Sequence, residues 1–180
     1  MRRSRIVLAS LLASLILAGF AGAEGAEAKV VMPFVGQKAA AILRTASKVE
    51  VFRIAKMRVL KPEADAIEGH PLKAKGKDQD QVFAAKLAAI LLDNRTYSFD
   101  SAKGCIFQPG IVFRVHGGEG QGTVDVIVCF DCTELRVITR DADGKTVKTV
   151  GEDFDNARPA LVALAKAAFP DDAEIQALKE

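Results

Sequence analysis

Apolar residues recur at helical spacing in three stretches of the chain. Residues 37–46, 80–92 and 157–169 each place apolar side chains three and four positions apart, which gives a helix one apolar stripe. Asp80 is a good N-cap for the second stretch, and Pro159 suits the first turn of the third. A short terminal helix starting at Asp171 or Asp172 is expected after Pro170. The pattern therefore predicts three main helices, each with one face for a core.

Alternation with period two predicts strands in the remaining apolar segments. The predicted strands are 49–54, 111–116, 123–130, 135–139 and 146–150. A glycine-rich loop at 117–122 and a tight turn containing Asp143-Gly144 make two hairpins of the last four. Neither face of 49–54 is purely polar, so the sheet should be covered on part of both sides, with this strand at an edge. Residues 61–71 are expected to form a turn-rich connection, and the lysine-rich residues 73–80 a solvated loop.

These elements indicate an α+β fold. We expect residues 24–180 to form a single α+β domain: an antiparallel β-meander of four to five strands, with the helices packed mainly on one face. About 157 residues are enough for one domain with a real core and few for two.

Residues 1–23 have the features of a signal peptide. Three arginines precede an apolar run, and Ala21-Gly22-Ala23 follows it as a cleavage-type sequence. The apolar run is shorter than the roughly 20 residues of a membrane span. We therefore expect a bacterial protein exported to the periplasm or the medium, with no membrane span after cleavage.

The excess of basic over acidic residues in the whole chain comes from this leader. Removing its three arginines from the 25 basic residues leaves 22, against 23 acidic ones. The composition therefore gives no reason to expect a nucleic acid or an anionic membrane as a partner.

Three cysteines carry the strongest chemical signal, because export would place them in an oxidising compartment. If His116 pairs with Thr123, the hairpin register puts Cys105 opposite Glu134, near both Cys132 and Cys129. A disulfide of Cys105 with Cys132 or with Cys129 is possible, and so is Cys129–Cys132 if the chain turns between them. In each case one sulfur remains unpaired.

Two other interpretations of the cysteines stay open. Cys129-Phe-Asp-Cys132 has the spacing of a redox-active pair, but it falls between two strands and near acids rather than at a helix N-terminus. Alternatively, Cys105, Cys129 and Cys132 could bind zinc, with His116 or His70 as fourth ligand. A second paired motif is absent from the sequence, so we expect no cofactor.

The other polar candidates are few. Asp125 interrupts an apolar strand, and we expect it to form an exposed ion pair with Arg114 on the neighbouring strand; a buried functional acid is the alternative. Glu134 completes a possible polar site. His70 and His116 are expected to be exposed, and the chain has neither a nucleophile-elbow motif, nor a zinc-protease motif, nor a phosphate loop.

The residues Cys105-x-Phe107-x-Pro109-Gly110, followed by Val124-Asp125 and Cys129-Phe130-x-Cys132, resemble a pattern in exported bacterial proteins of unknown function. The similarity covers roughly residues 48–170. It implies that the cysteine cluster and Asp125 belong to one structural unit, and it implies no activity.

Without a catalytic set, the sequence favours a non-catalytic binding or structural-interaction domain stabilised by one disulfide. Its partner would be a protein or a small ligand, and the loops at 104–110 and 131–134 are the expected contact surface. The alternative is an exported thiol-redox or zinc-binding enzyme that uses Cys105, Cys129 and Cys132.

Overall fold

The computed structural model describes residues 31–32, 34–59, 65–100 and 103–180, so the predicted signal peptide lies outside the described residues. The helices are α2 (Gln37–Thr45), α3 (Gln81–Leu91), α4 (Arg158–Ala168) and α5 (Ala173–Gln176), with short 3-10 turns at Asn94–Thr96 and Asp155–Ala157. The strands are β1 (Lys48–Ile54), β2 (Ala66–Ile67), β3 (His70–Lys75), β4 (Ile111–His116), β5 (Thr123–Cys129), β6 (Glu134–Arg140) and β7 (Thr146–Asp153).

The strands form one antiparallel sheet in the order β2-β3-β1-β4-β5-β6-β7. The α+β class and the β4–β7 meander are confirmed, and so is the pairing of His116 with Thr123. The predicted count of four to five strands is wrong, because the sheet has seven. Strand β1 is also not an edge: β3 pairs with one side of it and β4 with the other.

The two missed strands lie where the sequence predicted a turn-rich connection and a solvated loop. Glu68 and Gly69 both have positive φ and form a two-residue turn, which joins β2 to β3. Strand β3 has little apolar alternation, and its residues 73–75 are exposed. Its pairing with β1 therefore comes from backbone hydrogen bonds rather than from burial, which is why hydrophobic periodicity did not reveal it.

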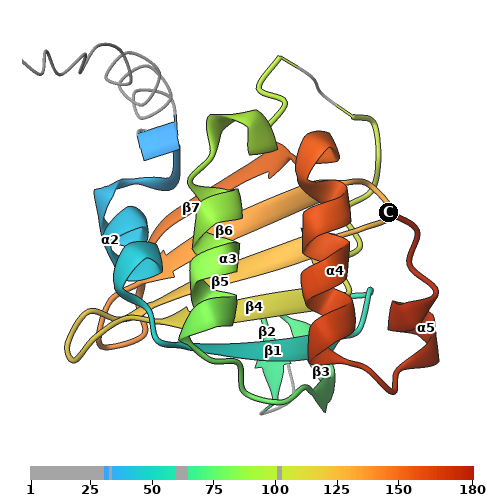
Figure 1. Cartoon of the computed structure of the whole chain (residues 1–180), viewed down its shortest axis with the longest axis horizontal. Helices are drawn as coiled ribbons and strands as arrows, with labels where there is room; N and C mark the ends of the chain where they lie inside the picture. The colour runs from blue at the N-terminus through green and yellow to red at the C-terminus, as the bar shows by residue number, and fades with distance from the viewer. Residues whose placement is uncertain (1–30, 33, 60–64, 101–102) are drawn as a thin grey trace, which may run out of the picture.

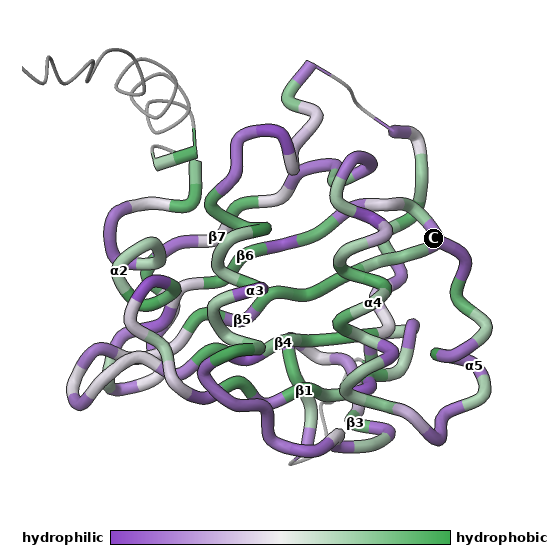
Figure 2. The backbone as a smooth tube through the Cα atoms, viewed as in Figure 1, coloured by the Kyte–Doolittle hydropathy of each residue, from purple (hydrophilic) through white to green (hydrophobic). Residues whose placement is uncertain are grey.

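Helices α2, α3 and α4 cover one face of the sheet (Figure 1). Their apolar stripes meet the inward side chains of the central strands, and the green stretches of Figure 2 gather in these elements. Asp80 caps α3 as expected, accepting a hydrogen bond from the Phe83 N–H at 3.0 Å. The main core therefore lies between this helical layer and the sheet.

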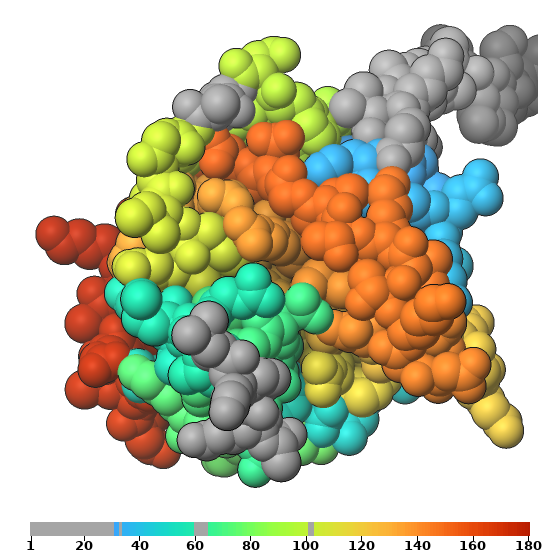
Figure 3. Space-filling view, turned by 180° about the vertical axis from the view of Figure 1, so that it is seen from behind, coloured from blue at the N-terminus to red at the C-terminus, as the bar shows by residue number. Residues whose placement is uncertain are grey.

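A smaller apolar cluster covers part of the other face. It consists of Phe52, Ile54, Ile67, Val112, Ile127 and Ile138, with Leu72 and Phe107 packed against it. Ile67 from the edge strand β2 belongs to the same cluster as Ile138 on β6, so the sheet curls over its own second face. Figure 3 shows this face, with the cyan-to-green residues around β2 and β3 lying over it beside the orange strands. The expectation that both sides are partly covered is confirmed.

The glycine-rich loop 117–122 needs its last glycine for a steric reason. Gly122 has a φ of +89°, and a Cβ there would lie 2.2 Å from the carbonyl oxygen of Arg140. We expect Gly122→Ala to lower the free energy of unfolding by about 2 kcal/mol. Gly118→Ala is the matched control, because its Cβ would meet only ordinary contacts from 3.7 Å outward. Urea unfolding of both variants checks this, and equal stability of the two would contradict it.

Candidate functional site

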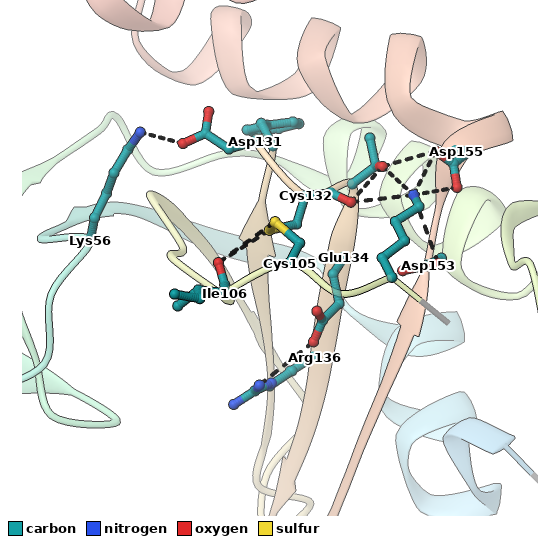
Figure 4. Close-up of a disulfide and its surroundings, with 12 residues drawn as sticks. Lys56, Cys105, Ile106, Asp131, Cys132, Glu134, Arg136, Asp153 and Asp155 are labelled. Atoms are coloured by element: carbon teal, nitrogen blue, oxygen red, sulfur yellow. Dashed lines mark hydrogen bonds and ion pairs between the residues drawn. A yellow bond between two sulfur atoms is a disulfide. The ribbon is translucent and has the colours of Figure 1, made fainter. Parts of the chain in front are cut away.

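The structure joins two loops at one end of the sheet through a cystine. Cys105 and Cys132 lie at disulfide distance, with Cα atoms 5.9 Å apart, whereas Cys129 is buried with a free thiol. The bond connects residues 103–110, named here the strap, to the turn 130–133 between β5 and β6 (Figure 4). Of the pairings that the sequence left open, this is the one between Cys105 and Cys132.

Lys103 fixes the beginning of the strap to the same turn. Its ammonium group lies 2.5 Å from Thr133 Oγ1 and 3.3 Å from the carbonyl oxygen of Cys132. It also contacts the Asp155 carboxylate at 2.6 Å, and this hydrogen bond holds the pKa of Asp155 below its ordinary value. The strap is therefore tied to the turn by a covalent bond at Cys105 and by the hydrogen bonds of Lys103, two residues earlier.

The middle of the strap packs against the second face of the sheet. The Arg136 guanidinium lies 3.9 Å from the centroid of the Phe107 ring, a cation–π arrangement. Ile106, between Cys105 and Phe107, is 79% exposed. Met57 is 68% exposed and touches the strap at Gln108, whose Nε2 lies 3.6 Å from the Met57 sulfur. The strap thus presents Ile106 to solvent beside the exposed Met57, although the cystine anchors its backbone.

A pocket of about 130 Å³ opens beside the strap. It is lined by Arg53, Ile54, Lys56, Lys73, Gln108, Gly110, Ile111, Phe130, Asp131, Glu174, Ile175 and Leu178. Gln108 and Gly110 belong to the strap, and Phe130 and Asp131 belong to the turn that the cystine joins to it. The pocket therefore lies between the two loops that the sequence predicted as a contact surface, 104–110 and 131–134, and the C-terminal part of the chain.

Two cationic contacts hold the walls of this pocket. Arg158, the first residue of α4, donates a hydrogen bond to the Phe130 carbonyl oxygen, and its guanidinium lies 5.8 Å from the centroid of the Phe130 ring. Arg53 on β1 binds Asp172 at 2.5 Å and also pairs with Glu174, which attaches α5 to the sheet. Residues distant in the sequence thus enclose the pocket from opposite sides.

The carboxylate of Asp172 has a second role at the start of α5. It accepts a hydrogen bond from the Ile175 N–H at 3.1 Å and so caps the helix. Burial acts to raise the pKa of Asp172, but the Ile175 N–H and the Arg53 guanidinium together hold this pKa below its ordinary value. Asp172 is therefore ionised at neutral pH, and the ion pair with Arg53 is charged on both sides.

Asp125 is paired with Arg114 as predicted, but the pair is not exposed. The Asp125 side chain has no solvent exposure, and its two oxygens accept hydrogen bonds from Arg114 at 2.7 and 2.9 Å. Arg140 adds a third contact at 3.3 Å and also pairs with Glu68 on the β2–β3 turn. The curl of the sheet encloses this network. The charge of this buried carboxylate is balanced by two guanidiniums that hydrogen-bond it, which indicates a structural role.

The other predicted polar residues do not contact Asp125. Glu134 lies at the opposite end of β6, where it pairs with Arg136 at 3.6 Å. His116 is half-buried and hydrogen-bonds Glu50 at 2.7 Å. His70 is buried, which corrects the prediction of exposure. Its Nδ1 lies 2.8 Å from the Ala55 carbonyl oxygen, and burial lowers its pKa.

Of the site residues that the sequence analysis did not name, Arg140 could have been found from the sequence. In the β5–β6 register Asp125 faces Ile138, so Arg140 is its diagonal neighbour two residues on. Glu68, Lys103 and Arg53 gave no such signal, because their ion-pair partners Arg140, Asp155 and Asp172 are each more than 50 residues away in the sequence.

Within the described ranges, no group of three or more histidine, cysteine or acidic side chains is placed to hold a metal ion. Among the helices of the same ranges, none is both long and apolar enough to cross a membrane. The comparisons with protein-family models, curated proteins and solved structures found no match to this chain.

Proposed function

We propose that the protein is an exported, non-catalytic binding protein whose site is the pocket beside the cystine. The observation that carries this proposal is the position of the pocket: the strap and the β5–β6 turn each form part of its wall, and the Cys105–Cys132 bond joins them. A preformed concave site with apolar walls and a few polar groups is the usual form of a small-ligand site.

Export supports this role for the cystine. An oxidising compartment would keep the Cys105–Cys132 bond closed without a dedicated oxidant. The leader-like residues 1–23 are the sequence basis for export. The bond then has a structural purpose, since it holds one wall of the pocket against another.

The alternative function, a thiol-redox or zinc-binding enzyme, needs the sulfurs in a different arrangement. A zinc site would require Cys105, Cys129 and Cys132 together as thiolates, whereas two of them are joined here and the third is buried. A redox-active Cys129–Cys132 pair would require a bond that the Cys105–Cys132 cystine replaces. The described contacts therefore favour binding over thiol chemistry.

Protein-observed NMR with a set of neutral fragments of about ten non-hydrogen atoms tests the proposal. We expect shift changes to concentrate at residues 53–56, 108–111 and 130–131. Gly110→Leu should abolish them, because a Cβ at Gly110 points into open space at the pocket wall. Gly104→Leu is the matched control: it lies on the same strap with equally open space but does not line the pocket.

Two results would overturn the binding function. One is that the fragments shift only residues outside the pocket, or shift no residues at all. The other is substrate turnover by the purified protein that is lost when Asp125, Cys129 or Cys132 is replaced.

A further inference from the structure

The size of the pocket limits its occupant. An apolar cavity of about 150 Å³ accommodates a benzene ring, so the 130 Å³ here fit a single ring or a short branched chain. Five apolar side chains form the walls: Ile54, Ile111, Phe130, Ile175 and Leu178. The body of a matching ligand is therefore small and apolar.

One of the three cations around the pocket has no carboxylate partner among the described residues. Arg53 is occupied by Asp172 and Glu174, and Lys56 binds Asp131 at 2.5 Å. The third cation, Lys73 on β3, is exposed and has no carboxylate partner among the described residues. With Asp172 counted, three cations and three carboxylates surround the pocket, but Arg53 holds two of the carboxylates and Lys73 holds none.

These charges favour one kind of polar group on the ligand. A single ammonium at the rim of an apolar pocket suits a monoanion. A phosphate carries up to two charges and is held by several donors together, such as a guanidinium or backbone N–H groups beside a lysine, whereas the only arginine in the lining is already bound to two carboxylates. A carboxylate on an apolar body satisfies both the walls and the rim.

We propose that the pocket binds a small apolar monocarboxylate, an aromatic or branched aliphatic acid of about the size of benzoate. The apolar body lies against Phe130 and Ile175, and the carboxylate accepts hydrogen bonds from the Lys73 ammonium. This inference rests on the proposed binding function and adds the chemical class of the ligand.

The proposal is tested by titrating the protein with benzoate and with its neutral isostere benzamide at neutral pH, with protein-observed NMR as the readout. We expect both compounds to shift the pocket residues, with benzoate binding about fivefold more tightly. Lys73→Met should remove this preference while leaving the benzamide affinity within about twofold, because methionine keeps the apolar stem of the side chain. Lys38→Met, an exposed lysine on α2 outside the pocket, should leave the preference intact.

The possible failures are distinguishable. If benzamide and benzoate bind the pocket equally well, or if Lys73→Met keeps the preference, the carboxylate assignment is overturned and the binding site stands. If neither compound nor any neutral fragment shifts the pocket residues, the proposed function itself fails. The midpoint temperature of thermal unfolding should be the same for Lys73→Met and for the wild type, which would show that this exposed substitution leaves the fold unchanged.

Discussion

Removing the Cys105–Cys132 bond should lower the free energy of unfolding by about 3.5 kcal/mol, in the chain-entropy account of a loop of 27 residues. The bond restricts the unfolded chain, so its loss increases the entropy of that state more than that of the folded one. The double variant Cys105→Ser/Cys132→Ser and the wild-type protein in a thiol-free reductant should both show the loss. Urea unfolding at neutral pH measures it, and the strap residues 103–110 should also lose amide protection.

Cys129 provides the control for this prediction. Cys129→Ala removes a buried thiol that the cystine does not use, and should cost about 1 kcal/mol through the small cavity it leaves. Reductant should then destabilise Cys129→Ala by the same amount as wild type. A reductant effect that disappears in Cys129→Ala would mean that Cys129 forms the disulfide, with either Cys105 or Cys132 as its partner, and would contradict the Cys105–Cys132 bond.

Asp125→Ala should be the most damaging single substitution, with a loss of about 3–5 kcal/mol. It leaves the Arg114 guanidinium without its carboxylate and close to Arg140, and both arginine side chains are mostly buried. Asp125→Asn keeps the shape and removes the charge, so it should fall between wild type and Asp125→Ala. Urea unfolding of the three proteins measures the series.

Asp78 is the matched control for Asp125. It also contacts two cations, Lys48 at 3.2 Å and Lys75 at 3.0 Å, but these groups are about half exposed. Because solvent screens exposed ion pairs, Asp78→Asn should lower the free energy of unfolding much less than Asp125→Asn does. If Asp125→Ala does not fold, the pair Asp125→Leu/Arg114→Met should recover stability, since it removes both charges. If the substitutions at Asp78 and Asp125 lowered the free energy of unfolding equally, the claim that burial makes the Asp125 ion pairs important for stability would be contradicted.

The sequence predicted the parts of the fold that depend on local pattern. The helices begin and end within a residue or two of the expected positions, because apolar spacing and the Asp80 cap are local signals. The β4–β7 meander follows from two hairpins whose turns contain the glycines that the geometry needs. The pairing of His116 with Thr123 sets the register of the β4–β5 hairpin, and this register places Arg114 opposite Asp125.

What the sequence missed depends on the curl of the sheet. Strand β3 is short and polar, so only its pairing with β1 identifies it. Once β2 and β3 fold over the second face, Glu68 reaches Arg140 and the Asp125–Arg114 pair loses its solvent. The pocket requires β1, the strap and α5 at the same point, and pairings over such sequence distances leave no periodic signal.

The most direct test of the account is a thiol map of the purified protein. Alkylation of the denatured, unreduced chain followed by peptide mass spectrometry should give one modified cysteine, Cys129, with the Cys105 and Cys132 peptides joined, and metal analysis should find no stoichiometric zinc. Three alkylated cysteines with bound zinc would contradict the account, and so would a disulfide that contains Cys129. In either case the strap and the β5–β6 turn would no longer be held together as the walls of a binding pocket.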